Sequence, residues 1–362
     1  MNQSNIVMVG TKKGAFVFES KDGRRSWRST GPHFKGTQVF HVTRDPRSKV
    51  IFAAVDNFVW GPTVARSTDL GRTWKESEKP PKFPKGSGLS VGKVWHIQPA
   101  NEDEPDVMYC GTDPAALFKS LDGGVTWSLN QALFKHKTRP KWQAGFGGLC
   151  LHSILVDPRD PDTLIIAISS VGVVKSTDGG RTWAFRNKNV LADFLPPGHQ
   201  FPEYGQCTHH LVRTPSRPDV IYHQNHAGVY RSDDNAENWV DISEGLPSRF
   251  GFGIAVDFND PKRVYVAPEE SGAARLPPNG RFLVWGSDDA GKSWSPLSSG
   301  LPRHSFYNVL REGMASDMED PCGVYFGTTT GQLYGSRNGG ERWELIADGL
   351  PPIYSVSTGS GP

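Results

Sequence analysis

The chain has 362 residues, and its 40 lysine and arginine residues against 38 aspartate and glutamate residues give a formal net charge of +2. The two signs are interspersed, which argues against a dedicated nucleic-acid surface, and no apolar run reaches membrane-spanning length. The four cysteines form neither a disulfide framework nor a CxxC pair, and the first residues lack the pattern of a signal peptide. We therefore expect a cytoplasmic protein that binds neither nucleic acid nor membranes.

An eight-residue segment recurs along the whole chain, at a spacing of about fifty residues that is typical of propellers or solenoids. Its clearest copy runs from Ser176 to Trp183 and reads STDGGRTW. Its composition predicts a tight turn, because aspartate bonds nearby backbone N–H groups, glycine supplies positive φ, and tryptophan packs beneath the turn. The seven copies end at Trp27, Trp74, Trp127, Trp183, Trp239, Trp294 and Trp343.

Short β-like runs precede each copy, most clearly in the fourth repeat. There we expect strands at 152–156, 163–169 and 171–175, and a further strand that begins at Trp183. Four antiparallel strands per repeat make a propeller blade. The expected blades, all in one domain over 1–362, are approximately 353–358 with 5–30, 38–78, 92–131, 149–188, 206–243, 250–298 and 306–348.

The two ends of the sequence predict how the first blade is completed. The chain begins with what would be a second strand, Asn5 to Val9. Its last β-like run, Ile353 to Ser357, follows a Gly-Leu-Pro segment like those that precede the first strands of blades six and seven. We therefore expect an all-β, seven-bladed β-propeller, closed by the C-terminal strand in the first blade, since closure removes exposed sheet edges.

The repeated turn resembles the Asp-box, or BNR, repeat of sialidases, sortilin-type receptors, family 74 glycosidases and photosystem assembly factors. The resemblance covers nearly the whole chain, but it implies a fold rather than a chemistry, because the motif builds turns. A true sialidase would need an arginine-containing segment before the first copy, and the residues before Ser20 contain no arginine. The chain therefore resembles bacterial BNR-repeat proteins described as glycosyl hydrolase-like or sialidase-superfamily-like, without being a true sialidase.

Histidines are predicted to gather at the end of the blades that carries the long insertions. Alignment on the Pro-Asp turns places His96, His152 and His209 in one register at the beginning of the first strand. His41 lies one position later in its blade, and His226 lies in a neighbouring loop. The insertions, which antiparallel order places at one end, are residues 31–37, 78–92, 132–148, 188–205 and 269–280.

These five histidines predict a site for a divalent metal, which would be Zn, Mn, Fe or Cu, because neutral imidazole is the commonest metal ligand. The structural alternative is that they bond backbone groups or water between blades. Cys150 and Cys207 lie two residues before His152 and His209. For both cysteines a small buried residue is the favoured interpretation over a metal ligand.

Carboxylates, aromatic rings and cations in the same region predict substrate chemistry. Glu203 and Glu269 are predicted to be catalytic, because two carboxyl groups can form an acid/base pair for glycoside cleavage. Aromatic faces stack on sugar rings and cations attract anionic groups, although the same residues could simply pack the loops. Arg311 and Glu312 are expected at the opposite end, where they would close the first strand of blade seven. The predicted substrate-binding residues are Trp60, Trp142, Arg139, Tyr204 and Gln224.

Two functions stay open from the sequence. The first is a metal-dependent enzyme of hydrolase or lyase type, with a His-lined pocket that takes a carbohydrate or another small polar substrate. The second is a non-catalytic propeller that docks a partner protein. Three histidines in register favour the enzyme, since a docking surface would not need recessed imidazoles.

Overall fold

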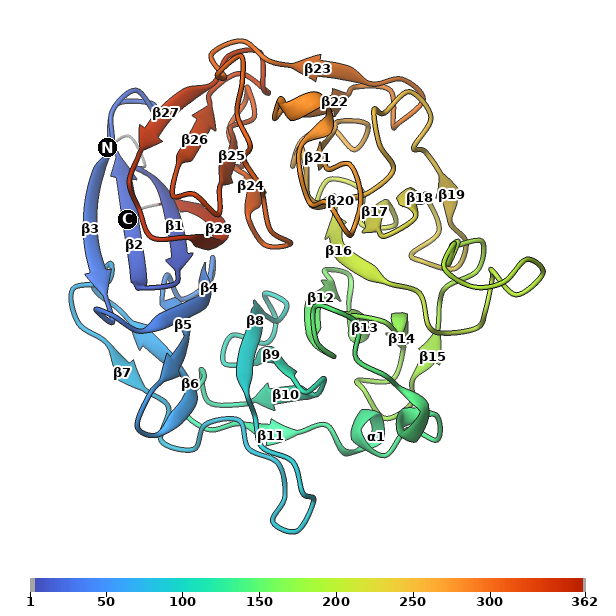
Figure 1. The fold of residues 1–362 in the computed structure, drawn as a ribbon. Coiled ribbons are helices and arrows are strands. Elements are labelled where there is room, and N and C mark those ends of the chain that lie inside the picture. Colours follow the sequence, from blue (N-terminus) through green and yellow to red (C-terminus); the bar gives the residue numbers. More distant parts are fainter. Residues whose placement is uncertain (1–3, 361–362) are drawn as a thin grey trace. The chain divides into compact units, whose positions relative to one another are not determined.

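The computed structural model describes residues 4–360, which form seven antiparallel sheets of four strands each (Figure 1). This is the seven-bladed β-propeller that the repeat predicted. Short, β-branched runs bounded by Gly, Pro and Asp form the strands, and helices are confined to α1 (Gln131–Phe134), η1 (Arg139–Lys141) and η2 (Pro278–Gly280) within the described residues. In this part of the chain, none of these helices has the length and hydropathy needed to span a bilayer.

Each sheet is a meander of strands that are adjacent in sequence, except the first. The first four sheets are β28 (Ile353–Ser360), β1 (Asn5–Thr11), β2 (Gly14–Ser20) and β3 (Arg28–His33); β4 (Gln38–Arg44), β5 (Ile51–Asn57), β6 (Gly61–Ser67) and β7 (Lys75–Glu76); β8 (Lys93–Pro99), β9 (Met108–Asp113), β10 (Leu117–Ser120) and β11 (Ser128–Leu129); and β12 (Leu151–Asp157), β13 (Asp160–Ile168), β14 (Gly172–Ser176) and β15 (Ala184–Phe185). The remaining sheets are β16 (Thr208–Arg213), β17 (Ile221–Asn225), β18 (Gly228–Ser232) and β19 (Val240–Asp241); β20 (Gly251–Val256), β21 (Val264–Pro268), β22 (Val284–Ser287) and β23 (Ser295–Leu297); and β24 (Met314–Ser316), β25 (Val324–Gly327), β26 (Leu333–Ser336) and β27 (Glu344–Ala347).

The C-terminal strand completes the first blade, as predicted. β28, at the red end of the colour bar, lies beside the blue β1 (Figure 1). Tyr354 stacks on Phe40 with ring centroids 5.0 Å apart. A Cβ atom added at Gly10 would lie 2.6 Å from the Ser355 hydroxyl oxygen, so only glycine allows this close approach.

Two compact parts make up the described chain. The first comprises residues 4–169, 175–184 and 354–360, and the second comprises 170–174 and 185–353. Each part has its own apolar cores between neighbouring sheets, in which the inward faces of the strands are almost completely buried. Burial of such side chains is the main stabilising contribution in each part.

The repeated turns are held by hydrogen bonds within the turn itself. In the copy at Ser67, the serine hydroxyl donates to Asp69 at 2.8 Å and accepts from the Gly71 N–H at 2.8 Å. The same aspartate accepts from the N–H and hydroxyl of Thr73, at 2.8 and 2.7 Å. The turn therefore satisfies its polar groups locally, which explains why one short sequence can be reused along the chain.

The tryptophans that end these turns join neighbouring blades. Trp239 is 1% exposed, and its indole N–H donates to the backbone oxygen of Arg186 in the preceding blade at 2.7 Å. Trp294 donates in the same way to Ile242 at 2.8 Å. Trp343 donates to the Leu297 carbonyl, and Trp127 and Trp183 donate to the side-chain oxygens of Ser77 and Asn130. The tryptophans are thus structural in these turns, as expected for rings that pack under them.

The turn aspartates predict how stability depends on pH. Hydrogen bonds that the hydroxyl and the N–H of Thr182 donate to the carboxylate lower the pKa of Asp178 from 3.8 to about 2. A carboxyl with a depressed folded-state pKa stabilises the protein above its unfolded pKa, and this contribution is lost as the pH falls through the folded value. We expect the melting temperature to fall steeply from pH 3.8 down to about 2.

Substitution of Asp178 by Asn distinguishes the contribution of this carboxyl group from the other effects of low pH on stability. Asn338 occupies the equivalent position in the seventh copy and accepts from Ser336 at 2.9 Å, so the variant should fold. We expect a lower melting temperature than the wild type near neutral pH and a difference that shrinks as the pH approaches about 2. An exposed control, Asp103→Asn, should follow the wild type at every pH. A difference for Asp178→Asn that is constant with pH would contradict the prediction.

Candidate functional site

β-Bulges near the beginnings of the first strands change the predicted register of the histidines. In the β16–β17 pair, Thr208 pairs with Asn225 and His210 pairs with Gln224, so His209 is the extra residue of a bulge. His152 occupies the same bulge position in the β12–β13 pair. These two histidines are therefore equivalent, as the alignment on Pro-Asp turns predicted.

His96 does not share their register. In the β8–β9 pair the bulge residue is Trp95, and His96 pairs with Gly111, the position that corresponds to His210. The prediction of one register for three histidines is therefore wrong by one residue at His96, because a bulge was not visible in the sequence pattern. His96 instead stacks on His41, with ring centroids 4.6 Å apart.

The histidines of the first part pack against their neighbours. The Nδ1 atom of His41 accepts from the Ile97 N–H at 3.2 Å, and His152 is fully buried with its Nδ1 atom 3.0 Å from the Ser153 hydroxyl. Within the first part as described, His152 does not join His41 and His96 in a group whose ligand atoms lie within 4.8 Å of one another. The predicted five-histidine site is thus not gathered as one set in this part.

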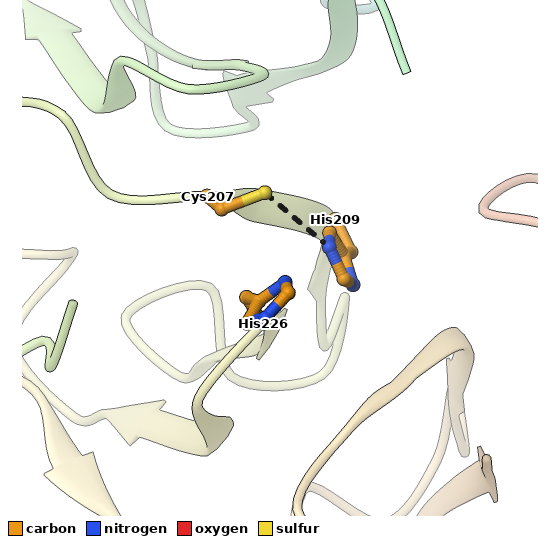
Figure 2. Close-up of side chains that lie close together, drawn as sticks. All are labelled: Cys207, His209 and His226. Carbon is orange, nitrogen blue, oxygen red and sulfur yellow. Dashed lines mark hydrogen bonds between the residues drawn. The ribbon is translucent and has the colours of Figure 1, made fainter. Parts of the chain in front are cut away.

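The second part brings two of the predicted histidines together and adds a cysteine. The sulfur of Cys207 and one ring nitrogen each of His209 and His226 all lie within 4.8 Å of one another (Figure 2). The Cys207 Sγ atom is 3.5 Å from His209 Nε2. Cys207 immediately precedes β16, and His226 follows β17, where its N–H donates to the Cys207 carbonyl at 2.9 Å. We call these three residues the Cys-His-His cluster.

Burial sets the protonation of the cluster. It lowers the pKa of His209 well below its ordinary value and also lowers the pKa of His226. The same burial raises the pKa of the Cys207 thiol, against the opposing effect of the Arg311 and Arg275 charges. At neutral pH the two imidazoles are therefore neutral and the sulfur carries its proton.

Arg311 belongs to the surroundings of the cluster, contrary to the sequence prediction. The first strand of blade seven is β24, which begins at Met314, so Arg311 precedes the strand instead of closing it. Its guanidinium lies 5.3 Å from the ring centre of Phe252, and that ring stacks on His209 at 4.3 Å. The sequence predicts this strand too early: the β-like run before it is irregular in the structure, and β24 begins only after the turn at Gly313.

Glu269 is the predicted catalytic residue with the most unusual environment. It is 3% exposed, and burial raises its pKa from 4.5 to about 7, although Asn308 and Arg275 favour the charged form. The Asn308 amide donates to Oε1 at 3.2 Å, whereas Oε2 is buried with no hydrogen-bond partner among the described residues. The N–H of Glu269 donates to the carbonyl of Phe250, whose ring contacts both histidines of the cluster. A protonated carboxyl near neutral pH is suited to donate a proton.

Three other predicted site residues are exposed or partly exposed. Trp60 is 84% exposed on the β5–β6 connection, which also carries the exposed Phe58. Tyr204 stacks on Phe185 with ring centroids 4.9 Å apart. The Glu203 side chain is exposed, and its backbone oxygen accepts from Asn187 at 3.0 Å. These positions leave Trp60 and Glu203 open to a ligand.

The remaining predicted substrate-binding residues have packing roles. Trp142 is 8% exposed and donates from Nε1 to the Thr138 hydroxyl at 2.9 Å. Arg139 lies over the Trp142 ring at 5.5 Å and donates to the Ala115 carbonyl at 2.7 Å. Gln224 is buried in β17 and donates to backbone carbonyls that include that of Asn225, at 3.0 Å. These contacts fit the alternative in which such residues fix the loops.

A cavity of about 340 Å³ lies in the first part, at the end of the strands that carries the repeated turns. Arg66, Thr73 and Asp122 are among its lining residues, and both Thr73 and Asp122 belong to the turns. This cavity is therefore not the pocket expected among the long insertions.

The curated proteins that are similar to this chain include xyloglucanases. No family model matches the chain. A xyloglucanase of Acetivibrio thermocellus is 27% identical over 277 residues, which cover 70% of this chain and 31% of that protein. A xyloglucanase of Hypocrea jecorina is 26% identical over 296 residues, covering 74% of this chain and 33% of that protein. The chain thus spans about a third of the length of the curated relatives that it matches.

Solved structures support the fold. The GH74 enzyme of Niastella koreensis superposes with a TM-score of 0.66 at 16% identity, covering 96% of this chain and 56% of that one. AztD from Citrobacter koseri, in its apo form, superposes with a TM-score of 0.58 at 12% identity over 99% of both chains. At these identities the likeness establishes the shared propeller architecture.

Proposed function

We propose that this chain is a glycan-acting hydrolase in which Glu269 donates the proton to the leaving group. The observation that carries the proposal is the buried carboxyl of Glu269, whose pKa is raised to about 7. The similarity to xyloglucanases supports a carbohydrate substrate, and a branched β-glucan is the first to test.

The acid role follows from the chemistry of glycoside cleavage. The glycosidic oxygen leaves as an alcohol only if it receives a proton, and a carboxylic acid that stays protonated near neutral pH supplies one. Oε2 of Glu269 has no competing hydrogen bond among the described residues, so its proton is not committed to another acceptor. Asn308 holds Oε1 and thereby orients the carboxyl group.

A second carboxylate is needed to activate water or to attack the sugar. We propose that the 188–205 insertion supplies it. Asp193 is exposed, and its charge opposes the burial that lowers the pKa of His226. The ring of the adjacent residue Phe194 packs edge-on against His226, with ring centroids 6.0 Å apart, so Asp193 lies near the cluster. Glu203, the residue predicted from the sequence, lies in the same insertion. Parallel Asp193→Asn and Glu203→Gln variants distinguish the two.

The decisive variant is Glu269→Gln, which removes the acidic proton of the carboxyl group and keeps the shape of the side chain. We expect it to lower kcat/KM on xyloglucan by about 10²- to 10⁴-fold, the usual contribution of general acid catalysis. The loss should be much smaller on an aryl glucoside with a dinitrophenolate leaving group, which departs without protonation. Reducing-end release and phenolate absorbance measure the two reactions. Equal losses on both substrates would assign Glu269 a structural role instead.

The pH profile gives an independent readout. Because the Glu269 proton is present below about pH 7 and lost above it, wild-type kcat/KM should fall as the pH rises through that value. The hydrogen bond from Asn308 and the charge of Arg275 lower this pKa and so favour the charged carboxylate, but burial has the larger effect. The exposed neighbour Glu270 provides the matched control, and Glu270→Gln should keep both rate and profile. Full activity of Glu269→Gln on xyloglucan would refute the proposal.

The predicted alternative, a propeller that docks a partner protein, stays a prediction, as does metal dependence of the hydrolase. A glycan ligand is part of the proposal, and Trp60 is the exposed ring best suited to stack on it. Isothermal titration of wild type and Trp60→Ala with a xyloglucan oligosaccharide tests that role separately from catalysis.

A further inference from the structure

The Cys-His-His cluster has the composition and spacing of a transition-metal site. A zinc ion holds sulfur at about 2.3 Å and nitrogen at about 2.0–2.1 Å, so tetrahedral angles separate these two ligand atoms by about 3.6 Å. Cys207 Sγ and His209 Nε2 are 3.5 Å apart, and the His226 ring nitrogen lies within 4.8 Å of both. One sulfur and one nitrogen thus already span an edge of a tetrahedron, and the third ligand needs only a small side-chain movement.

A hydrogen bond on the far side of His209 prepares it as a ligand. Its Nδ1 atom lies 2.6 Å from the carbonyl oxygen of Gly251. A carbonyl only accepts, so Nδ1 must carry the hydrogen, which leaves the lone pair of Nε2 directed at the sulfur of Cys207. This is the arrangement in which metal-bound imidazoles are usually held, with the other ring nitrogen donating to a backbone carbonyl.

Aromatic rings fix the positions of both histidines. Phe252 stacks on His209 at 4.3 Å, and Phe250 packs edge-on against His209 at 5.2 Å and His226 at 5.0 Å. A Cβ atom at Gly272 would lie 2.8 Å from the His226 ring, so glycine lets the 269–283 connection cover it closely. The two phenylalanine rings and the 269–283 connection therefore enclose the imidazoles and hold them in place.

The charges around the cluster indicate what completes the coordination. Two of the ligands are neutral and one becomes a thiolate, so a divalent ion leaves one net positive charge. The guanidinium groups of Arg275 and Arg311 each lie 5.3 Å from the ring centre of Phe252, which stacks on His209. Three protein ligands leave one position open, and the two guanidinium groups favour an anion there, such as hydroxide or a carboxylate.

We propose that Cys207, His209 and His226 bind one zinc-type divalent ion with an open fourth position. A thiolate ligand selects zinc over manganese, magnesium or calcium. Binding breaks the S–H bond of Cys207 and forms the metal–sulfur bond, and the proton passes to solvent, so each ion bound releases one proton. The site does not depend on the hydrolase proposal, because binding is measured without turnover.

The test uses the full chain, produced without a histidine tag and freed of metal with a chelator. We expect one Zn²⁺ or Co²⁺ per chain in equilibrium dialysis, with one proton released per ion in weakly buffered solution. Bound Co²⁺ should show the intense visible bands of a tetrahedral site and a thiolate charge-transfer band. Manganese should bind more than about 100-fold more weakly, because it lacks an affinity for thiolate.

Single substitutions identify the ligands. Cys207→Ala and His226→Ala should each weaken binding by more than about 100-fold, since even changes to groups that hold the ligands cost roughly 10- to 100-fold. His226 is only half-buried and lies in a connection, so its variant should keep the wild-type circular dichroism spectrum and serves where Cys207→Ala is unstable.

The fourth blade offers a matched control. Cys150 precedes His152 by the same spacing, but its sulfur contacts the Ser169 hydroxyl at 3.1 Å, and no third ligand joins the pair within the described residues. Cys150→Ala should therefore bind metal as the wild type does. Binding that survives Cys207→Ala, or a cobalt spectrum without the thiolate band, would overturn the proposal.

Discussion

Removal of residues 353–362 is expected to abolish cooperative folding of the first blade and to lower the melting temperature more than any single substitution. β28 is the strand that completes the sheet of β1, β2 and β3. Ile353 and Ser355 are fully buried and Val356 is 4% exposed, and each apolar side chain contributes about 1.5–3 kcal/mol on burial. The deletion would also expose the hydrogen-bonding edge of β1 to other chains.

Complementation distinguishes loss of this strand from general damage. A synthetic peptide of residues 351–360 should bind the truncated chain and restore much of the melting temperature. A peptide with proline at position 355 should fail, because proline has no N–H for the ladder. Circular dichroism melts and light scattering, which reports edge-to-edge aggregation, are the measurements. A truncated chain that melts like the full one would show that β28 is dispensable.

Trp239→Ala should destabilise the second part by about 3–5 kcal/mol, the usual cost of removing a large buried aromatic side chain. Trp239 is among the largest fully buried side chains and packs edge-on against His223, with ring centroids 5.2 Å apart. The substitution also leaves the carbonyl of Arg186 without its indole donor, which adds to the cost.

Two comparisons make this prediction specific. Trp239→Phe keeps most of the apolar volume and loses the hydrogen bond, so it should cost clearly less than the alanine variant. Trp60→Ala, at a ring that is 84% exposed, should change the free energy of unfolding by less than about 0.5 kcal/mol. Urea unfolding measures all three. A cost for Trp239→Ala similar to that of Trp60→Ala would mean that the turn tryptophans do not hold the blades together.

The sequence predicted part of the candidate site. The sequence indicates His209, His226 and Glu269, because histidine near a strand start and carboxylates in a long connection are visible as residue types. For Cys207 the sequence favours a small buried residue over a metal ligand. Its spacing of two from His209 was the available signal, but Cys150 has the same spacing from His152 without forming a cluster.

The sequence alone determined the architecture of this protein. A turn whose polar groups are satisfied within eight residues can be recognised wherever it recurs, so the number of blades and the place of the last strand followed from local chemistry.

Only the tertiary structure decided which histidines meet. A bulge at Trp95 instead of at the following residue moved His96 out of register with His209. A bulge leaves no fixed mark in the sequence, since it arises from how two strands pair. The raised pKa of Glu269 likewise depends on burial by residues distant in the chain, which local patterns do not specify.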